Sequence, residues 1–202
     1  PAVTAATGID AMVHAIEAYT SALKKNPMSD LLAREALRLL AANLDEAVHN
    51  GSNREARQAM LLGACLAGQA FANAPVAAVH ALAYPLGGNF HIPHGLSNAL
   101  VLPQVLRFNV SAAATHYGEL APIILGERLR TGDPSTYAEQ LIAEFEQMSA
   151  RVGLPTRLRD AGVPEEMLPQ LAKEAMLQQR LLVNNPREVS EADALAIYQA
   201  AY

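Results

Sequence analysis

Three histidines lie within fifteen residues of one another, in and beside an apolar segment of the chain. His80, His91 and His94 occur in the stretch AVHALAYPLGGNFHIPHGLSNAL. His80 falls on an apolar helical face, where a lone histidine is more often a hydrogen-bonded core residue than a ligand. His94 stands between a proline and a glycine, a sequence also typical of a surface turn. His91 can equally be a loop residue without a chemical role.

A carboxylate and a fourth histidine stand near the start of the chain. Asp10 and His14 are four residues apart, a spacing that places both side chains on one face of a helix. An aspartate in a first helical turn also stabilises the helix dipole without any further role. Taken with His80 and His94, however, the pair forms a ligand set for a borderline divalent ion such as Fe²⁺ or Zn²⁺. The composition of the set does not choose between these metals.

The elements that must position these residues are all predicted to be helices. Apolar residues recur at helical spacing along most of the chain, and no alternation of period two indicates a strand. We therefore expect an all-α fold, with residues 1–202 forming one helical domain. A third helix is expected after the Ser52–Glu55 capping box, and a fourth around His80, ending at the Pro85–Gly88 break. The other expected helices span residues 4–21, 26–51, 95–108, 111–124, 134–152, 164–180 and 190–202. Because residues 59–67 are apolar nearly all round, the third helix is expected in the middle of the domain.

Composition excludes several classes of partner. The net charge is −5, and the 15 lysines and arginines form no basic stripe, so nucleic acid and anionic membrane are not expected partners. No apolar run reaches the length of a membrane span, and the first residues do not look like a signal peptide. Cys65 is the single cysteine, which favours a reducing, cytoplasmic location. We expect Cys65 to be a small core residue and not a nucleophile.

Two segments together resemble a known family. TGIDAMVHAIEAYTS, followed by FANAPVAAVHALAYPLGGNFHIPHGLSNALVLPQVLRFN, is similar to the iron-containing (group III) alcohol dehydrogenases, and the tail NNPREVSEADALAIYQAAY resembles that family's ending. The resemblance implies metal ligands at Asp10, His14, His80 and His94. It also implies hydride transfer between a small alcohol or aldehyde substrate and NAD or NADP.

The family has a second domain that is not recognisable here. Its N-terminal α/β domain carries a glycine-rich dinucleotide loop, and no strand followed by such a loop occurs in this sequence. LGGNFHIPHG follows no strand and lacks the required glycine spacing. We therefore expect this chain to be the C-terminal, metal-binding half, without the N-terminal nucleotide-binding domain and with little or no activity alone. Formation of a homo-oligomer is left open.

The sequence departs from the family at Tyr84. Many members have histidine at this position, and a phenol is a poorer base than an imidazole near neutral pH. Tyr84 can still donate a hydrogen bond or belong to a proton path, and His91 is a candidate to compensate. Both are our candidate catalytic residues. Phe71 and Asn73 are candidates to line the substrate pocket, although core packing and a helix end explain them as well.

Rival interpretations remain open at this point. Glycerol dehydrogenase and dehydroquinate synthase are similar in architecture but use a metal set with fewer histidines. A di-iron carboxylate bundle needs two Glu-x-x-His motifs, and only Glu46–His49 matches. A helical interaction module without metal would be marked by an exposed apolar stripe.

Overall fold

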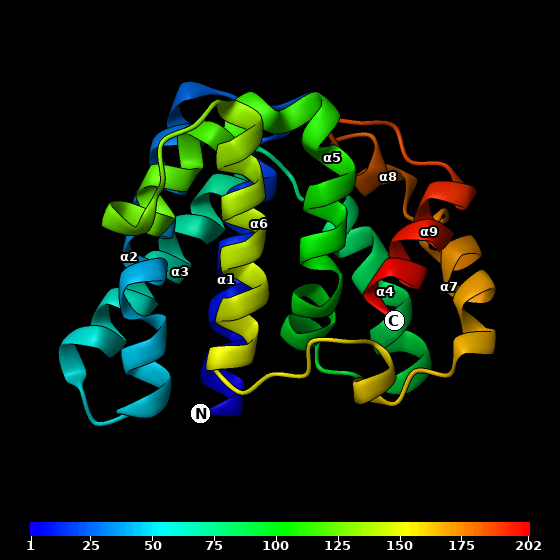
Figure 1. Cartoon of the computed structure of the whole chain (residues 1–202), viewed down its shortest axis with the longest axis horizontal. Coiled ribbons are helices and arrows are strands. Elements are labelled where there is room, and N and C mark those ends of the chain that lie inside the picture. Colours follow the sequence, from blue (N-terminus) through cyan, green and yellow to red (C-terminus); the bar gives the residue numbers. More distant parts are fainter.

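The computed structural model describes all 202 residues, and its regular elements are all helical (Figure 1). The prediction of an all-α fold is therefore confirmed. Three single-turn 3₁₀ helices accompany nine α-helices: α1 Ala2–Tyr19, α2 Pro27–His49, α3 Arg54–Asn73, α4 Ala78–Phe90, α5 His94–Leu125, α6 Pro134–Arg151, α7 Leu168–Ala175, α8 Gln179–Leu182 and α9 Glu191–Ala201.

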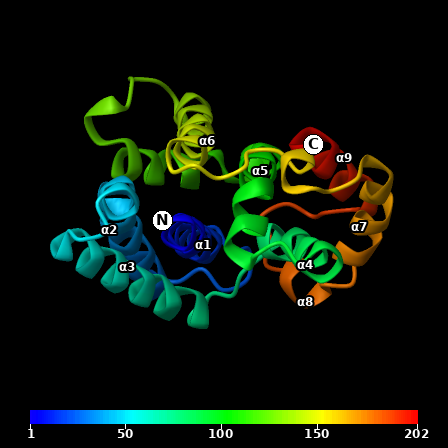
Figure 2. The same ribbon diagram turned by 90° about the horizontal axis from the view of Figure 1, so that it is seen from below.

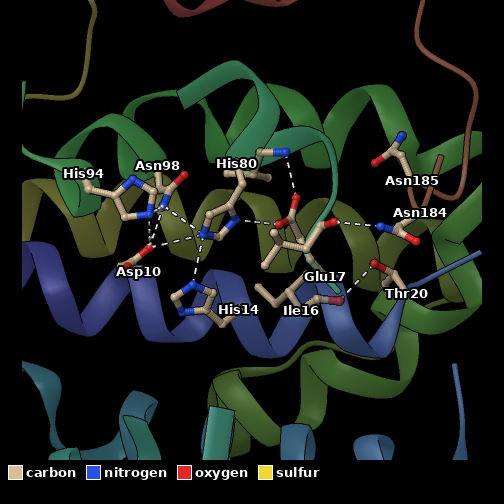
Figure 3. A network of polar contacts seen from close by, with 12 residues as sticks. Asp10, His14, Ile16, Glu17, Thr20, His80, His94, Asn98, Asn184 and Asn185 are labelled. Atoms are coloured by element: carbon tan, nitrogen blue, oxygen red, sulfur yellow. Dashed lines mark hydrogen bonds and ion pairs between the residues drawn. The ribbon is translucent and has the colours of Figure 1, made fainter. Parts of the chain in front are cut away.

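Helix α1 lies in the interior of the molecule. It packs against α2, α3 and α5, and Figure 2 shows it end-on among these helices. Alanines, isoleucines and a methionine make it apolar on nearly all sides, as a helix surrounded by other helices must be. Polar side chains interrupt this surface on one face, at Asp10, His14 and Glu17. That face is the one that meets α4 and α5 (Figure 3).

Helix α5 runs through the middle of the molecule and joins its two groups of helices (Figure 1). It packs against α1, α2 and α6 on one side, and against α4 and α9 on the other. The second group consists of α4, α7, α8 and α9. One contiguous cluster of buried apolar side chains extends through both groups, so the two groups share a core.

The first turn of α5 approaches α1 unusually closely. A Cβ atom on Gly95 would clash with the backbone carbonyl group of Ala6. Backbone atoms of a packed helix cannot move aside as a flexible side chain can. A glycine is therefore required at this crossing, and it brings the preceding residue, His94, against the face of α1 that carries Asp10.

Two expected helix breaks are absent from the structure. Helix α4 continues through Pro85–Gly88 as far as Phe90, because one missing amide does not outweigh the burial of Leu82 and Leu86 on either side of the proline. Helix α5 likewise continues through residues 109 and 110. Asn109 does not end a helix there, because its buried side chain is paired with Asn185.

Helix α3 is not the central helix that its composition predicts. Only four of its residues are buried, all of them small, whereas Leu61 is 75% exposed. The helix packs on α1 and α2 through these small residues, and its outer face has no neighbour. Cys65 lies on this face and is exposed, so its expected place in the core was wrong. Apolar composition alone cannot report which neighbours a helix has.

Helix termini follow the sequence signals with small differences. Asn53 caps α3 by accepting a hydrogen bond from the amide of Ala56, and the Ser52–Glu55 capping box does not form. The capping box of α9, between Ser190 and Asp193, is present. The expected helix over residues 164–180 is divided into a 3₁₀ turn, α7 and the start of α8.

None of the helices by itself combines the length and the hydropathy that a membrane-spanning segment needs. Helices α3 and α4 have the required length and composition only when they are taken together, and the two helices are bent by 107° relative to each other.

Candidate metal centre

Three helices bring four potential metal ligands to one point (Figure 3). Asp10 and His14 come from consecutive turns of α1, His80 from the first turn of α4, and His94 from the first residue of α5. One ligand atom from each of these residues can be chosen such that all four lie within 4.8 Å of one another. The structure therefore brings together the four residues that the sequence analysis selected as ligands.

The ring nitrogens face the same small volume. His80 Nε2 lies 3.0 Å from His14 Nε2 and 3.6 Å from Asp10 Oδ1. His94 Nε2 also lies 3.6 Å from Asp10 Oδ1. The Asp10 carboxylate is thus within reach of two imidazoles from two other helices. The lone pairs of the neutral ring nitrogens and of the Asp10 carboxylate therefore lie close together, and a cation between them is favourable.

Burial differs strongly among the four side chains. The side chain of His80 is 2% exposed and that of Asp10 is 17% exposed, whereas that of His94 is 47% exposed. His80 therefore forms the closed side of the site, and His94 lies on its open side. Among these three candidate ligands, His94 is the most accessible to a small molecule.

The pKa values of two of the histidines move in opposite directions. Burial lowers the pKa of His14 to about 4 against the attraction of Asp10. Burial is also the largest effect on the pKa of His80, but it is outweighed by attraction to Glu17, by the contact with Asp10 and by the hydrogen bond to Glu17, which raise the pKa to about 9. Burial opposes ionisation of Asp10, yet the contact with His80 and the charges of the histidines lower the pKa of its carboxyl group. Shifts of opposite sign within one cluster are typical of functional sites.

Two further polar residues belong to the site and were missed in the sequence. Asn98 lies one turn after His94 on α5 and is fully buried. Its Nδ2 donates a hydrogen bond to Asp10 Oδ1 and lies 3.2 Å from His94 Nε2. Its Oδ1 is buried without a hydrogen-bond partner. The spacing of four residues from His94 was the signal that could have identified it.

Glu17 is the second missed residue. It lies one turn after His14 on α1, it is 4% exposed, and its Oε2 is 2.7 Å from His80 Nδ1. A carboxylate can only accept a hydrogen bond, so Nδ1 carries the proton and Nε2 faces the other ligands. A glutamate at this spacing on an otherwise apolar helix was a signal that it shares the face of Asp10 and His14.

The donor set is chemically suitable for Fe²⁺ or Zn²⁺. One carboxylate and three imidazoles are ligands that both ions accept, and the outward ring nitrogen of His80 already has a carboxylate partner. All four candidate ligands come from helices, which hold them in place. The residues present therefore fit a divalent transition metal and leave the side of His94 open.

The remaining candidates surround the site to different degrees. The ring of Phe71 stacks on that of His14 at a centroid distance of 4.3 Å, and the ring of Tyr84 lies 5.9 Å from that of His94. Asn73 is exposed, and its side chain donates to the carbonyl of Gln69 within α3. His91 is exposed and ends α4 in a left-handed conformation with φ of 55°, outside the four-ligand cluster.

The alternative di-iron motif is not part of any such cluster. His49 Nε2 lies at the end of α2, 3.1 Å from the carbonyl oxygen of Arg151. Glu46 accepts hydrogen bonds from Asn50 and Asn53 in the following turn. Both residues of the motif thus have local structural partners.

Comparisons with known proteins show the family to which the chain is similar. Residues 4–202 match the model of the Fe-containing alcohol dehydrogenase family, C-terminal part. The chain is 46% identical over 202 residues to long-chain-alcohol dehydrogenase 1 of Geobacillus thermodenitrificans, covering 100% of this chain and 51% of that protein.

Solved structures are similar over the same extent. A crystal structure of 1,3-propanediol oxidoreductase has a TM-score of 0.94 at 42% identity, covering all of this chain and 52% of that one. A sulfoacetaldehyde reductase from Bifidobacterium kashiwanohense, solved in complex with NAD⁺, has a TM-score of 0.82 at 31% identity, covering 98% of this chain and 50% of that one. The chain thus spans about half the length of the relatives it matches. With its helical fold, its Asp-His₃ cluster and a family match over almost its whole length, the chain belongs to the iron-containing alcohol dehydrogenase family, of which it represents the C-terminal part.

Proposed function

We propose that this chain supplies the metal- and substrate-binding half of a metal-dependent alcohol dehydrogenase or aldehyde reductase. The observation that carries the proposal is the convergence of Asp10, His14, His80 and His94 within 4.8 Å, in a chain whose relatives are named as alcohol dehydrogenases. In this proposal a hydride passes between a small alcohol or aldehyde and NAD or NADP.

These four residues would hold Fe²⁺ or Zn²⁺. When bound, such an ion supplies Lewis-acid polarisation of the substrate oxygen. His80, on the closed side, anchors the cluster from α4, while the half-exposed His94 leaves the opposite side accessible to substrate. Asp10 contributes the negative charge that offsets part of the charge of the ion.

Residues beside the cluster would orient the substrate. Phe71 stacks on His14, and therefore presents an apolar edge next to the ligands. Tyr84 lies beside His94 on the open side, where its hydroxyl group can donate a hydrogen bond to a substrate oxygen or pass on a proton. His91 stays a candidate for proton transfer, although its left-handed conformation also explains it as the residue that ends α4.

The nicotinamide would be bound largely by residues outside this chain. The relatives are about twice as long, and one of them was solved with NAD⁺. We therefore propose an N-terminal nucleotide-binding domain as the partner of this half, and predict little or no turnover by the 202-residue chain alone. The proposal includes both NAD and NADP as the nucleotide, and both iron and zinc as the metal. Homo-oligomer formation and a cytoplasmic location stay predictions.

Metal content tests the first part of the proposal. The purified chain is expected to contain, or to take up on reconstitution, close to one Fe²⁺ or Zn²⁺ per chain, measured by elemental mass spectrometry. The double variant His80→Ala/His94→Ala should contain none, while retaining its helical circular dichroism. A chain that remains metal-free after reconstitution with either ion contradicts the proposal.

A chimera tests hydride transfer. The C-terminal half of the 1,3-propanediol oxidoreductase, which is 42% identical, is replaced by this chain, and oxidation of 1,3-propanediol is followed with NAD⁺ and NADP⁺. We expect turnover that the His80→Ala/His94→Ala substitution abolishes. A chimera that binds one metal per chain but transfers no hydride with either nucleotide contradicts a dehydrogenase function. In the active chimera, Tyr84→Phe and His91→Gly then show which of the two candidates takes part.

A further inference from the structure

Glu17 connects the metal cluster to the start of helix α4. Its two carboxylate oxygens have different partners: Oε1 accepts the backbone amide of Val79 at 2.7 Å, and Oε2 accepts Nδ1–H of His80 at 2.7 Å. Both partners lie in the first turn of α4. Figure 3 shows the carboxylate between α1 and this turn, on the side of His80 that faces away from the other ligands.

The contact with Val79 replaces a missing helix cap. The N-cap residue of α4, Ala77, has no side chain that could accept a hydrogen bond, although the first amides of a helix lack intrahelical partners. The Glu17 carboxylate satisfies one of them from α1, and its negative charge is favourable at the positive end of the helix dipole. Glu17 therefore fixes the position of the first turn of α4 relative to α1. His80 directly follows Val79 in this turn, so its position is fixed as well.

The contact with His80 determines which ring nitrogen is free. Because the carboxylate accepts Nδ1–H, the lone pair of the neutral ring is on Nε2, which points at Asp10 and His14. An imidazole binds a metal only through an unprotonated nitrogen. The same carboxylate thus sets the position, the rotation and the tautomer of one ligand.

We propose that Glu17 is a positioning residue of the metal centre, which holds His80 in the metal-binding tautomer and anchors it to the first turn of α4. This inference rests on the proposed metal-dependent function and adds a residue that does not itself ligate. Mutation of an outer carboxylate that accepts the second N–H of a ligating histidine typically lowers metal affinity or activity 10–100-fold.

The substitution Glu17→Gln tests this role with almost no change of volume. The glutamine Oε1 can still accept a hydrogen bond from the backbone amide of Val79. The side-chain NH₂ group of the glutamine, which can only donate, then faces Nδ1 of His80. Nδ1 can accept this bond only if the proton moves to Nε2, which would block the metal-binding nitrogen. We therefore expect the dissociation constant for Zn²⁺ to rise about 10–100-fold. It is measured by competition with a chromophoric chelator at pH 9 or above, where protons compete least for His80 in either protein. The visible absorption of the Co²⁺-loaded protein should change as well, because the ligand geometry changes.

Glu144 provides a matched control. It is another buried glutamate, 3% exposed. It lies on α6 and forms ion pairs with Arg128 and Arg151. Glu144→Gln removes a buried charge and weakens hydrogen bonds, but it touches no residue of the cluster. It should lower the thermal midpoint of the metal-free chain while leaving the Zn²⁺ dissociation constant within about twofold.

The outcomes separate this inference from the proposed function. A wild-type chain that does not bind Zn²⁺ contradicts the proposed function. A wild-type chain that binds Zn²⁺, with Glu17→Gln binding it equally well or with Glu144→Gln weakening it as much, contradicts the role of Glu17 alone. If Glu17→Gln does not fold, proton NMR of the Zn²⁺-loaded wild type decides. We expect a slowly exchanging imidazole Nδ1–H signal that is missing in His80→Gln, and its absence from the wild type would overturn the inference.

Discussion

The Nε2 atoms of His14 and His80 lie 3.0 Å apart, although the two residues belong to different helices. Their pKa values have moved to about 4 and about 9, respectively. At neutral pH the pair therefore carries one positive charge, on His80, because both ring nitrogens of His80 are protonated and His14 is neutral. The proton on His80 Nε2 lies between the two rings. In the metal-free chain this proton takes the place, between the same lone pairs, that we propose for a divalent ion.

Metal binding at pH 7 should therefore release about one proton. His14 is already neutral at this pH, but His80 must lose its Nε2 proton before that nitrogen can ligate. Between about pH 6 and pH 9 the affinity should rise nearly tenfold per pH unit, and it should level off above the pKa of His80, which is about 9. Calorimetric titration with Zn²⁺ in two buffers of different ionisation enthalpy measures the proton count. Equal heats in the two buffers would refute this prediction.

The stability of the metal-free chain should be greatest near pH 6.5. The folded-state pKa of His80 is raised from 6.5 to about 9, so its stabilising effect is complete below 6.5 and is lost as the pH rises to 9. The folded-state pKa of His14 is lowered from 6.5 to about 4, so stability is lost as the pH falls from 6.5 towards 4. The first loss should be on the order of 3 kcal/mol. Urea unfolding in the presence of a chelator measures both limbs.

His80→Gln is the control for the alkaline limb of this profile. Glutamine keeps a polar side chain at the position but cannot carry the charge. The decline in unfolding free energy between pH 6.5 and 9 should therefore disappear in this variant. If the wild type and His80→Gln lose stability in parallel over this range, other groups cause the decline.

The crossing of α1 and α5 should tolerate no side chain larger than hydrogen at Gly95. In Gly95→Ala the new Cβ meets the backbone carbonyl of Ala6, so the helices must separate. Overpacking of this kind typically costs about 1–3 kcal/mol. Because His94 precedes Gly95, the separation should also move one ligand away from Asp10. We expect a lower free energy of unfolding and at least tenfold weaker Zn²⁺ binding.

Gly68 allows the same substitution without the clash. It lies within α3, and a Cβ there would have no atom within 4 Å. Gly68→Ala should therefore leave Zn²⁺ affinity unchanged and stabilise the chain by about 0.5–1 kcal/mol through helix propensity alone. Loss of Zn²⁺ affinity in Gly68→Ala would show that the effect at Gly95 is not specific to the crossing.

Local signals were sufficient to predict most of the helices. The starts of α2, α6 and α9 carry a proline or a capping residue with its partner nearby in the sequence, so their positions depend on neighbours along the chain. The continuity of α4 through Pro85 and of α5 through Asn109 depends instead on residues packed against them from elsewhere. Periodicity does not contain that information. The exposure of Leu61 on α3 could not be predicted for the same reason.

The site shows the same division between local and distant information. The spacing of Asp10 and His14 places both on one face of a single helix, and this could be read directly. The meeting of α1 with His80 and His94 is a tertiary relationship. The residue types suggested a common site, and the family resemblance implied the same four ligands. Glu17 and Asn98 shared helical spacing with the ligands, but their contacts with His80 and Asp10 cross between helices. Spacing could nominate them but could not assign them a partner.

The buried pair of Asn109 and Asn185 should contribute to stability as a unit. Each amide donates to the other's Oδ1, at 3.0 and 2.8 Å, and thereby ties α5 to the segment before α9. Replacing either residue by alanine leaves the partner's amide buried without this bond, which costs about 2 kcal/mol. Once the first partner is lost, the second substitution should cost much less, because the interaction is already broken. Urea unfolding of Asn109→Ala, Asn185→Ala and the double variant measures this coupling, and losses that simply add would show that the two amides contribute independently.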